Sequence, residues 1–245
     1  SLKYKDMLDL FLKVFYKNLV SKDLKIDNFT ILKNKEIERV FYDIVNSRDS
    51  NLLNIIELTT MKLVKLIEEN NGELLSRYMD YSYEIFKSAA NEEEKDKLRN
   101  KFEKVRNEIN KGCKSTIRKY FAKVNTSSLK LYKLFINSIE DYNIYNYENI
   151  NELKKETLDK LKNNTCEFED LSAVMYLCFN IKPNLEYKNI KHTIIDEAQD
   201  FGEFNFYSMK RVLPNSTFSI FGDIAQSIYD YRGIDSWEDA NKAMF

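Results

Sequence analysis

Residues 192–223 read HTIIDEAQDFGEFNFYSMKRVLPNSTFSIFGD and contain the clearest signals of secondary structure in the sequence. Residues 192–196 and 218–221 are short runs rich in β-branched and aromatic residues, which predict strands. The segment Glu203 to Val212 between them predicts a helix that stops before Pro214, because proline disfavours a helical residue in front of it. Strand, helix and strand in this order predict a βαβ unit with parallel strands. The strand runs are nearly continuous in apolar residues, which is typical of a sheet covered on both faces.

Both predicted strands end in acidic residues. Asp196 and Glu197 follow the first strand, and Asp223 follows the second. In parallel sheets, chemistry collects at the carboxyl ends of the strands. Phosphoryl transfer from a nucleotide needs a carboxylate near Mg²⁺ and a base that deprotonates water, and an Asp-Glu pair can supply both. For the Asp-Glu pair alone, an exposed acidic loop is an equally weighted alternative.

The first two thirds of the chain predict helix after helix. Apolar residues recur at helical spacing, as in the stripe of Tyr4, Met7, Leu8, Phe11 and Phe15. Only 5 Gly and 2 Pro are present, which also favours helices over a turn-rich β fold. Residues 74–111 predict one long helix or two in tandem, and residues 28–32 predict an extended segment. The fold class expected is mostly α with a small α/β part.

Composition narrows the class of protein. Hydrophobic residues make up 43% and charged residues 31%, which is typical of a folded globular chain, and the net charge of −1 advertises no general affinity for nucleic acid. Three cysteines far apart form no disulfide framework, which favours a reducing, cytoplasmic compartment. The sequence has no 18-residue apolar run, so no membrane partner is expected. The single histidine, His192, is expected to pack under the sheet rather than to bind a metal.

A second motif follows the second predicted strand. Residues 222–233 read GDIAQSIYDYRG, one helix and one strand after DEAQD at 196–200. The pair, in this order and spacing, resembles motifs II and III of UvrD/Rep-type superfamily 1 DNA helicases. The resemblance covers about residues 191–233. It implies a partial RecA-like (P-loop NTPase) parallel sheet, ATP and Mg²⁺ as cofactors, and ATP-driven movement on single-stranded or partly duplex DNA.

The resemblance also implies a role for each matched residue of the nucleotide site. Asp196 would coordinate Mg²⁺ through water, and Glu197 would be the base for the attacking water. Gln226 would reach the γ-phosphate and report its presence to the DNA site. Asp223 would lie in the same nucleotide site.

The remaining matched residues would meet single-stranded DNA. They are Tyr229, Tyr231 and Arg232. An aromatic face accepts any base by stacking, at about 1–3 kcal/mol per base, and an arginine beside it can contact phosphate. The position of Tyr231 is often Trp in the family, and Tyr keeps the stacking surface.

A basic stretch offers a second surface for a polyanion. Between Lys95 and Lys123 the sequence holds 11 basic and 3 acidic residues, a net charge of +8. Such a stretch can follow a phosphate backbone or an acidic protein surface. A solvated helix face is the alternative, with equal weight.

The sequence holds no glycine-rich loop ending in Gly-Lys-Ser/Thr, the phosphate cradle known as Walker A. Gly112-Cys113-Lys114 is the nearest match and lacks the preceding glycine. The family places this loop upstream of motif II, with a helical insertion between them. We therefore expect a fragment in which residues 1–165 form the 1B-type helical insertion and residues 166–245 a partial RecA-like domain 1A. Alone, this fragment is expected not to turn over ATP.

Flanking residues resemble one branch of the family, the helicase IV and HelD-like proteins. They are Phe168-Glu169-Asp170-Leu171, Met175-Tyr176-Leu177, Lys191-His192 and Ser236-Trp237-Glu238. HelD-like proteins bind bacterial RNA polymerase and clear it from nucleic acid. Two alternatives to a helicase therefore stay open: a polymerase-binding factor that uses ATP for release, and a nucleotide-gated scaffold without helicase activity.

Overall fold

The structure, a computed structural model, describes residues 2–47, 51–124, 127–163, 165–227 and 233–245. Contacts divide the chain into two compact units, which we call the motif unit (Ser1–Phe15 with Thr126–Phe245) and the hairpin unit (Tyr16–Asn125). Helix α1 (Leu2–Leu19) begins in the motif unit and ends in the hairpin unit. The domain boundary predicted between residues 165 and 166 was drawn between two types of family domain. The two contact units do not test it, so it stays a prediction.

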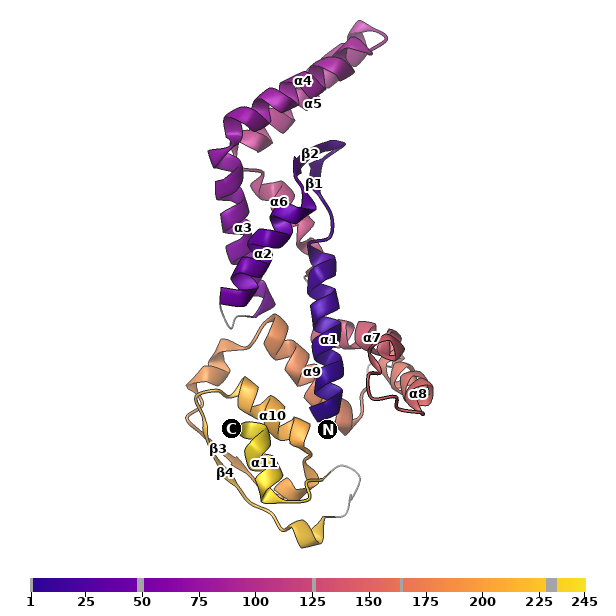
Figure 1. Cartoon of the computed structure of the whole chain (residues 1–245), viewed down its shortest axis with the longest axis vertical. Helices are drawn as coiled ribbons and strands as arrows, with labels where there is room; N and C mark the ends of the chain where they lie inside the picture. Colours follow the sequence, from indigo (N-terminus) through magenta and orange to yellow (C-terminus); the bar gives the residue numbers. More distant parts are fainter. Residues whose placement is uncertain (1, 48–50, 125–126, 164, 228–232) are drawn as a thin grey trace. The chain divides into compact units, whose positions relative to one another are not determined.

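The hairpin unit is helical except for one short antiparallel strand pair (Figure 1). Its elements are β1 (Leu24–Ile26), β2 (Phe29–Leu32), α2 (Asn34–Ser47), α3 (Leu52–Glu69), α4 (Asn71–Lys87), α5 (Glu92–Asn110), α6 (Lys114–Tyr120) and the 3₁₀ turn η1 (Ala122–Val124). Strand β2 confirms the extended segment predicted at 28–32.

Residues 74–111 form two helices, α4 and α5, which lie side by side in Figure 1. The break between them follows from local capping. Asn91 accepts a hydrogen bond from the backbone N–H of Glu94 at 2.9 Å, and three glutamates occupy the first turn of α5. A side-chain cap and negative charge both stabilise a helix N-terminus, so a new helix begins here.

The motif unit combines helices with a two-stranded parallel sheet. Besides the start of α1, its elements are α7 (Ser128–Asn137), η2 (Ile139–Tyr142), α8 (Ile150–Lys162), α9 (Phe168–Ile181), η3 (Leu185–Asn189), β3 (His192–Ile195), η4 (Ala198–Asp200), α10 (Glu203–Val212), β4 (Thr217–Ile220), η5 (Ile224–Gln226) and α11 (Trp237–Met244). The predicted strand, helix and strand are confirmed as β3, α10 and β4. The mostly α fold class with a small α/β part is confirmed as well.

One face of the β3–β4 sheet is buried. Ile195 at the end of β3 packs in a cluster with Phe206 of α10 and Met244 of α11, and Phe218 and Ile220 of β4 lie against it. Side chains alternate along a strand, so every second residue of β3 and β4 joins this core. This packing holds both strands against α10 and α11.

The other face of the sheet is exposed in the described part of the chain, so the expected cover on both faces is wrong there. Ile194 is 67% exposed, although it lies in the middle of an apolar run. His192 is also exposed rather than packed under the sheet. Its Nδ1 lies 2.6 Å from the hydroxyl of Thr217 and its Nε2 lies 3.2 Å from that of Ser219. Because successive side chains of a strand point to opposite faces, His192 and Ile194 lie on the face that α10 and α11 do not cover.

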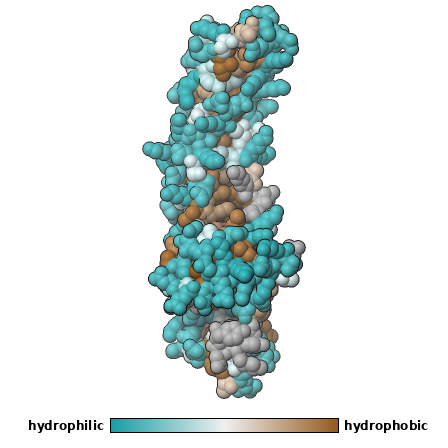
Figure 2. Space-filling view, turned by 90° about the vertical axis from the view of Figure 1, so that its right-hand side faces the viewer, coloured by the Kyte–Doolittle hydropathy of each residue, from teal (hydrophilic) through white to brown (hydrophobic). Residues whose placement is uncertain are grey.

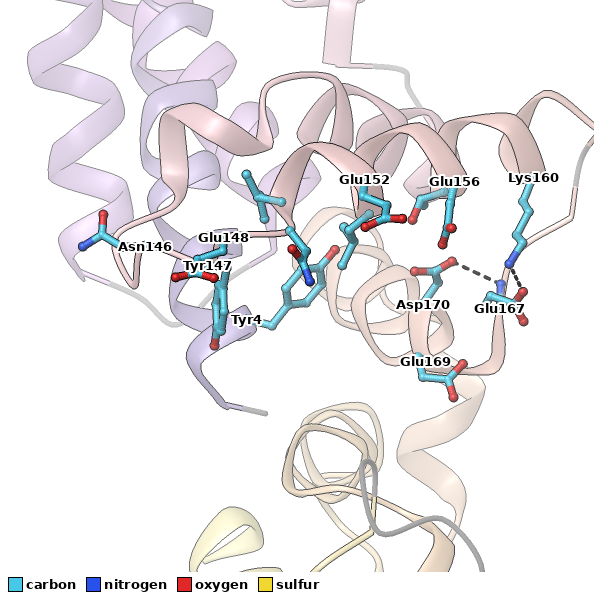
Figure 3. Close-up of a pocket in the computed structure, with 14 residues that line it drawn as sticks. Tyr4, Asn146, Tyr147, Glu148, Glu152, Glu156, Lys160, Glu167, Glu169 and Asp170 are labelled. Atoms are coloured by element: carbon cyan, nitrogen blue, oxygen red, sulfur yellow. Dashed lines mark hydrogen bonds and ion pairs between the residues drawn. The ribbon is translucent and has the colours of Figure 1, made fainter.

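Helices α1, α7 and α9 form a second core in the motif unit, with a partly buried chain of polar side chains at its centre. The Tyr132 hydroxyl, on a side chain with no exposed surface, donates to Asp170 Oδ1 at 2.5 Å and lies 3.0 Å from the Tyr4 hydroxyl. Burial raises the pKa of Asp170. Tyr4 and Asp170 border a cavity of about 740 Å³, and Figure 3 shows acidic residues of α8 and α9 around it, with Lys160 paired to Glu167.

Replacing Tyr132 with Phe is expected to lower the free energy of unfolding by about 1–3 kcal/mol, because it removes one of the two donors to the half-buried Asp170 carboxylate, whose other oxygen accepts the Glu167 N–H. A urea titration at neutral pH measures the change. Tyr145→Phe is the matched control: its hydroxyl donates to Asp6 at 2.6 Å, but the residue is 37% exposed. The control should stay within about 0.5 kcal/mol of the unsubstituted chain. A loss for Tyr132→Phe no larger than that for Tyr145→Phe would show that the Tyr132 bonds add no more stability than an exposed hydrogen bond does.

No helix in the described ranges has both the length and the apolar character needed to cross a membrane. The face of the molecule seen in Figure 2 is mostly hydrophilic, with hydrophobic residues gathered in small areas.

Candidate active site

The candidate site lies where β3 and β4 leave the sheet. The two strands pair in parallel from His192 opposite Thr217 to Ile195 opposite Ile220. Backbone hydrogen bonds continue past the last paired residues: Phe221 N–H donates to the Ile195 carbonyl at 2.8 Å, and Ala198 N–H donates to the Phe221 carbonyl at 2.9 Å. The loops after the two strands are therefore fastened to each other at one edge of the sheet.

The loop after β3 presents two carboxylates to solvent. Asp196 and Glu197 are both exposed. Glu197 has a left-handed backbone with φ 53° and ψ 38°, a conformation that costs an L residue roughly 1–2 kcal/mol. Asp196 Oδ1 accepts the Glu197 N–H at 3.0 Å, which stabilises this turn. Strained backbone of this kind is held only where its surroundings fix it.

Gln199 connects the two loops through its side-chain amide. It is only 4% exposed. Its Nε2 donates to Glu197 Oε2 at 2.7 Å, and its Oε1 accepts the backbone N–H of Asp223 at 3.1 Å. The amide therefore links the carboxylate of Glu197 to the start of the loop after β4.

The loop after β4 is organised by Asp223. Its Oδ1 accepts the Ala225 N–H at 3.0 Å, and its Oδ2 accepts the side-chain amide of Gln226 at 2.9 Å. Asp223 thus caps the 3₁₀ turn η5 and holds Gln226 beside it. Both side chains are exposed, so both are accessible to a ligand from solvent.

The structure brings four predicted residues of the nucleotide site to one edge of the sheet: Asp196, Glu197, Asp223 and Gln226. The roles assigned to them stay predictions. The predicted DNA contacts Tyr229, Tyr231 and Arg232 lie outside the described residues. Gln199 received no role from the sequence, since its bridge depends on two loops that meet only in the folded sheet.

The donor set at this edge fits a water-mediated Mg²⁺ rather than a closed protein cage. Across the described ranges, no group of three or more His, Cys, Asp or Glu side chains is arranged to hold a metal. Mg²⁺ keeps several waters and is usually bound by one or two carboxylates together with substrate phosphates. Asp196 supplies one exposed carboxylate at a strand end, which is what this mode of binding requires.

The predicted basic stretch runs from α5 through α6 to η1 in the hairpin unit, and its charge is partly neutralised. Five of its basic residues form ion pairs: Lys95–Glu92, Lys97–Glu93, Arg99–Asp96, Lys101–Asp27 and Lys114–Glu68. Exposed pairs of this kind contribute little stability but reduce the local positive charge. A polyanion-binding role for the stretch stays a prediction.

Comparison with known proteins agrees with the motifs. A family model described as the UvrD/REP helicase N-terminal domain matches residues 10–237. The ATP-dependent DNA helicase srs2 of Schizosaccharomyces pombe is 39% identical over 75 residues, which cover 30% of this chain and 8% of that protein. The match thus spans a small part of the relative's length. Because the family model matches most of the chain, the chain belongs to the UvrD/REP helicase family of superfamily 1.

Proposed function

We propose that this chain contributes the metal-binding and water-activating half of the ATP site of a DNA helicase that moves on single-stranded DNA. One observation carries the proposal: Asp196, Glu197, Asp223 and Gln226 meet at one edge of a parallel sheet, on loops joined by direct hydrogen bonds. Ligands of open α/β sheets bind at the carboxyl ends of the strands. Membership of the UvrD/REP family supports ATP as the ligand.

Each residue at this edge has chemistry suited to hydrolysis. The exposed Glu197 carboxylate can accept a proton from an attacking water, and the Asp196 carboxylate can orient metal-bound waters. The Gln226 amide can exchange its bond to Asp223 for one to a phosphate oxygen. When bound, Mg²⁺ neutralises charge on the β- and γ-phosphates. The proposal needs a phosphate-binding lysine from outside residues 1–245.

Fewer observations support DNA as the partner than support ATP as the ligand. Tyr229, Tyr231 and Arg232 are assigned by resemblance, and the unpaired cations of α5, α6 and the turn between them offer a second contact with phosphate. Lys104, Arg106, Lys111, Arg118 and Lys119 form no ion pair within the described part of the chain. Single-stranded DNA is therefore proposed as the activating partner. RNA polymerase, the alternative partner, rests on the resemblance of the flanking residues alone.

The test is the ATPase activity of the full-length natural protein. We expect hydrolysis that stops when EDTA removes Mg²⁺ and that rises severalfold when single-stranded DNA is added. Hydrolysis without any response to DNA would favour the nucleotide-gated scaffold. Tighter binding to RNA polymerase core than to DNA, with polymerase release driven by ATP, would favour the HelD-like alternative. Absence of ATP hydrolysis under all these conditions would overturn the proposal.

A further inference from the structure

We propose that Gln199 is a positioning residue that orients the Glu197 carboxylate and couples it to the loop after β4. The inference rests on the proposed function, since it concerns how the base of that site is held. Gln199 acts through Glu197 and not by its own contact with the reacting groups.

Hydrogen-bond chemistry fixes the orientation of the Gln199 amide. Its NH₂ group faces Glu197 Oε2 at 2.7 Å, and its carbonyl oxygen faces the Asp223 N–H at 3.1 Å. A flipped amide would set a carbonyl oxygen against the carboxylate and an NH₂ group against an N–H. Only one of the two orientations satisfies both partners, so the donor is directed at the carboxylate.

Packing restricts the amide further. Gln199 is 4% exposed, whereas Glu197 is exposed and, within the described part of the chain, its side chain bonds only to Gln199. The backbone of Gly222 lies against the amide so closely that a Cβ there would be 2.2 Å from Oε1. A buried, enclosed side chain can hold an exposed one, because it has few conformations of its own. A charge-assisted bond from such a donor restricts the carboxylate more than a bond from a mobile surface group would.

The backbone at Glu197 supports the same view. The main chain directly after this left-handed residue is held by the hydrogen bond from Ala198 N–H to the Phe221 carbonyl. The Glu197 carboxylate is held by the hydrogen bond from the Gln199 side chain. Main chain and carboxylate of Glu197 are therefore both tied to the β4 loop, and a movement of that loop would displace the base.

A purely structural tie between the two loops is the competing explanation. Two substitutions of the amide separate the two explanations. Gln199→Met keeps the length of the side chain and removes both bonds. Gln199→Glu keeps an oxygen for the Asp223 N–H but sets a second carboxyl group against Glu197, so it disturbs the base directly. A positioning role predicts that kcat falls further than the fraction of folded protein does, whereas a structural tie predicts that the two fall together.

In the full-length protein, Gln199→Met and Gln199→Glu are expected to lower kcat for ATP hydrolysis by about 10- to 100-fold, since small misplacements of a reacting group cost about that much. KM for ATP should change less than about twofold, because both ends of the Gln199 amide are bonded to protein groups. Ser208→Ala is the control for general destabilisation. Ser208 is fully buried in the same unit, and its hydroxyl donates to the Ser172 carbonyl at 3.3 Å, away from the site. It should leave kcat unchanged.

A double-mutant cycle with Glu197→Gln decides whether Gln199 acts through Glu197. If it does, Gln199→Met should change kcat less than about twofold in the Glu197→Gln background, because the base is already gone. Equal losses in both backgrounds, or a kcat for Gln199→Met equal to that of the unsubstituted protein, would overturn the positioning role. Failure of the proposed function has a different signature: no hydrolysis by the unsubstituted protein, or full activity of Glu197→Gln.

Discussion

Glu197→Gln in the full-length protein is expected to lower kcat for ATP hydrolysis by about 10²- to 10⁴-fold, the contribution typical of a general base. The amide cannot take a proton from water at neutral pH. It does keep an oxygen that can accept the Gln199 Nε2 now 2.7 Å from Glu197 Oε2, so the loop should stay folded. ATP affinity, measured by binding of a fluorescent analogue, should change less than about twofold because the base acts on water and not on the nucleotide.

The matched control for this substitution is Glu186→Gln. Glu186 is an exposed acid of the same unit, on η3, and its side chain lies outside the strand-end site. The same loss of one negative charge should leave kcat unchanged there. If the Glu197→Gln protein hydrolyses ATP as fast as the control, Glu197 is not the base. Its exposed carboxylate is then only part of an acidic loop.

The strand edge was predictable from sequence because its signals are local. The apolar runs, the Pro214 stop and the acidic strand ends are each readable within a few residues. Parallel strands joined by one helix must then leave the sheet on the same side, which brings Asp196 and Asp223 together. The predicted helix Glu203–Val212 has the same bounds in the structure for the same reason.

Other features depend on contacts that no local pattern encodes. Glu197 adopts a left-handed backbone, although glutamate has no preference for one. The bridge from Gln199 to Asp223 joins residues 24 positions apart and exists only once both strands have paired. The exposure of Ile194 could not be predicted either, because an apolar run has the same sequence pattern whether one face of the sheet or both are covered. Sequence therefore predicted the strand edge at which the candidate residues meet but not the hydrogen bonds between its two loops.

Gly222→Ala is expected to have the largest effect on stability among substitutions at the strand edge. The added Cβ would lie 2.2 Å from Gln199 Oε1, 3.0 Å from Ala198 N and 3.1 Å from Gln199 N. The side-chain oxygen can move, but the backbone nitrogen of Ala198 is held by its bond to the Phe221 carbonyl, the residue next to Gly222. Overpacking of this kind costs about 1–3 kcal/mol, measurable as a lower urea midpoint.

Gly72→Ala is the control, and it should change stability in the opposite direction. Gly72 lies in the first turn of α4, and a Cβ there would meet nothing within 4 Å. Alanine in place of a helical glycine should stabilise the chain by up to about 1 kcal/mol. Equal urea midpoints for the two variants would show that the crowding at Gly222 is relieved without cost.

The same crowding predicts a loss of activity that stability alone does not explain. A Cβ at residue 222 displaces the Gln199 amide from both Glu197 and Asp223, so kcat of the full-length protein should fall by about 10- to 100-fold, as for Gln199→Met. Shortening the displaced side chain in the double variant Gly222→Ala/Gln199→Ala removes the 2.2 Å clash. Part of the lost stability should then return while kcat stays low, because the donor to Glu197 is still missing. Recovery of kcat together with stability would mean that the site needs only an unstrained loop, and that the Gln199 bond to the carboxylate is a by-product of packing.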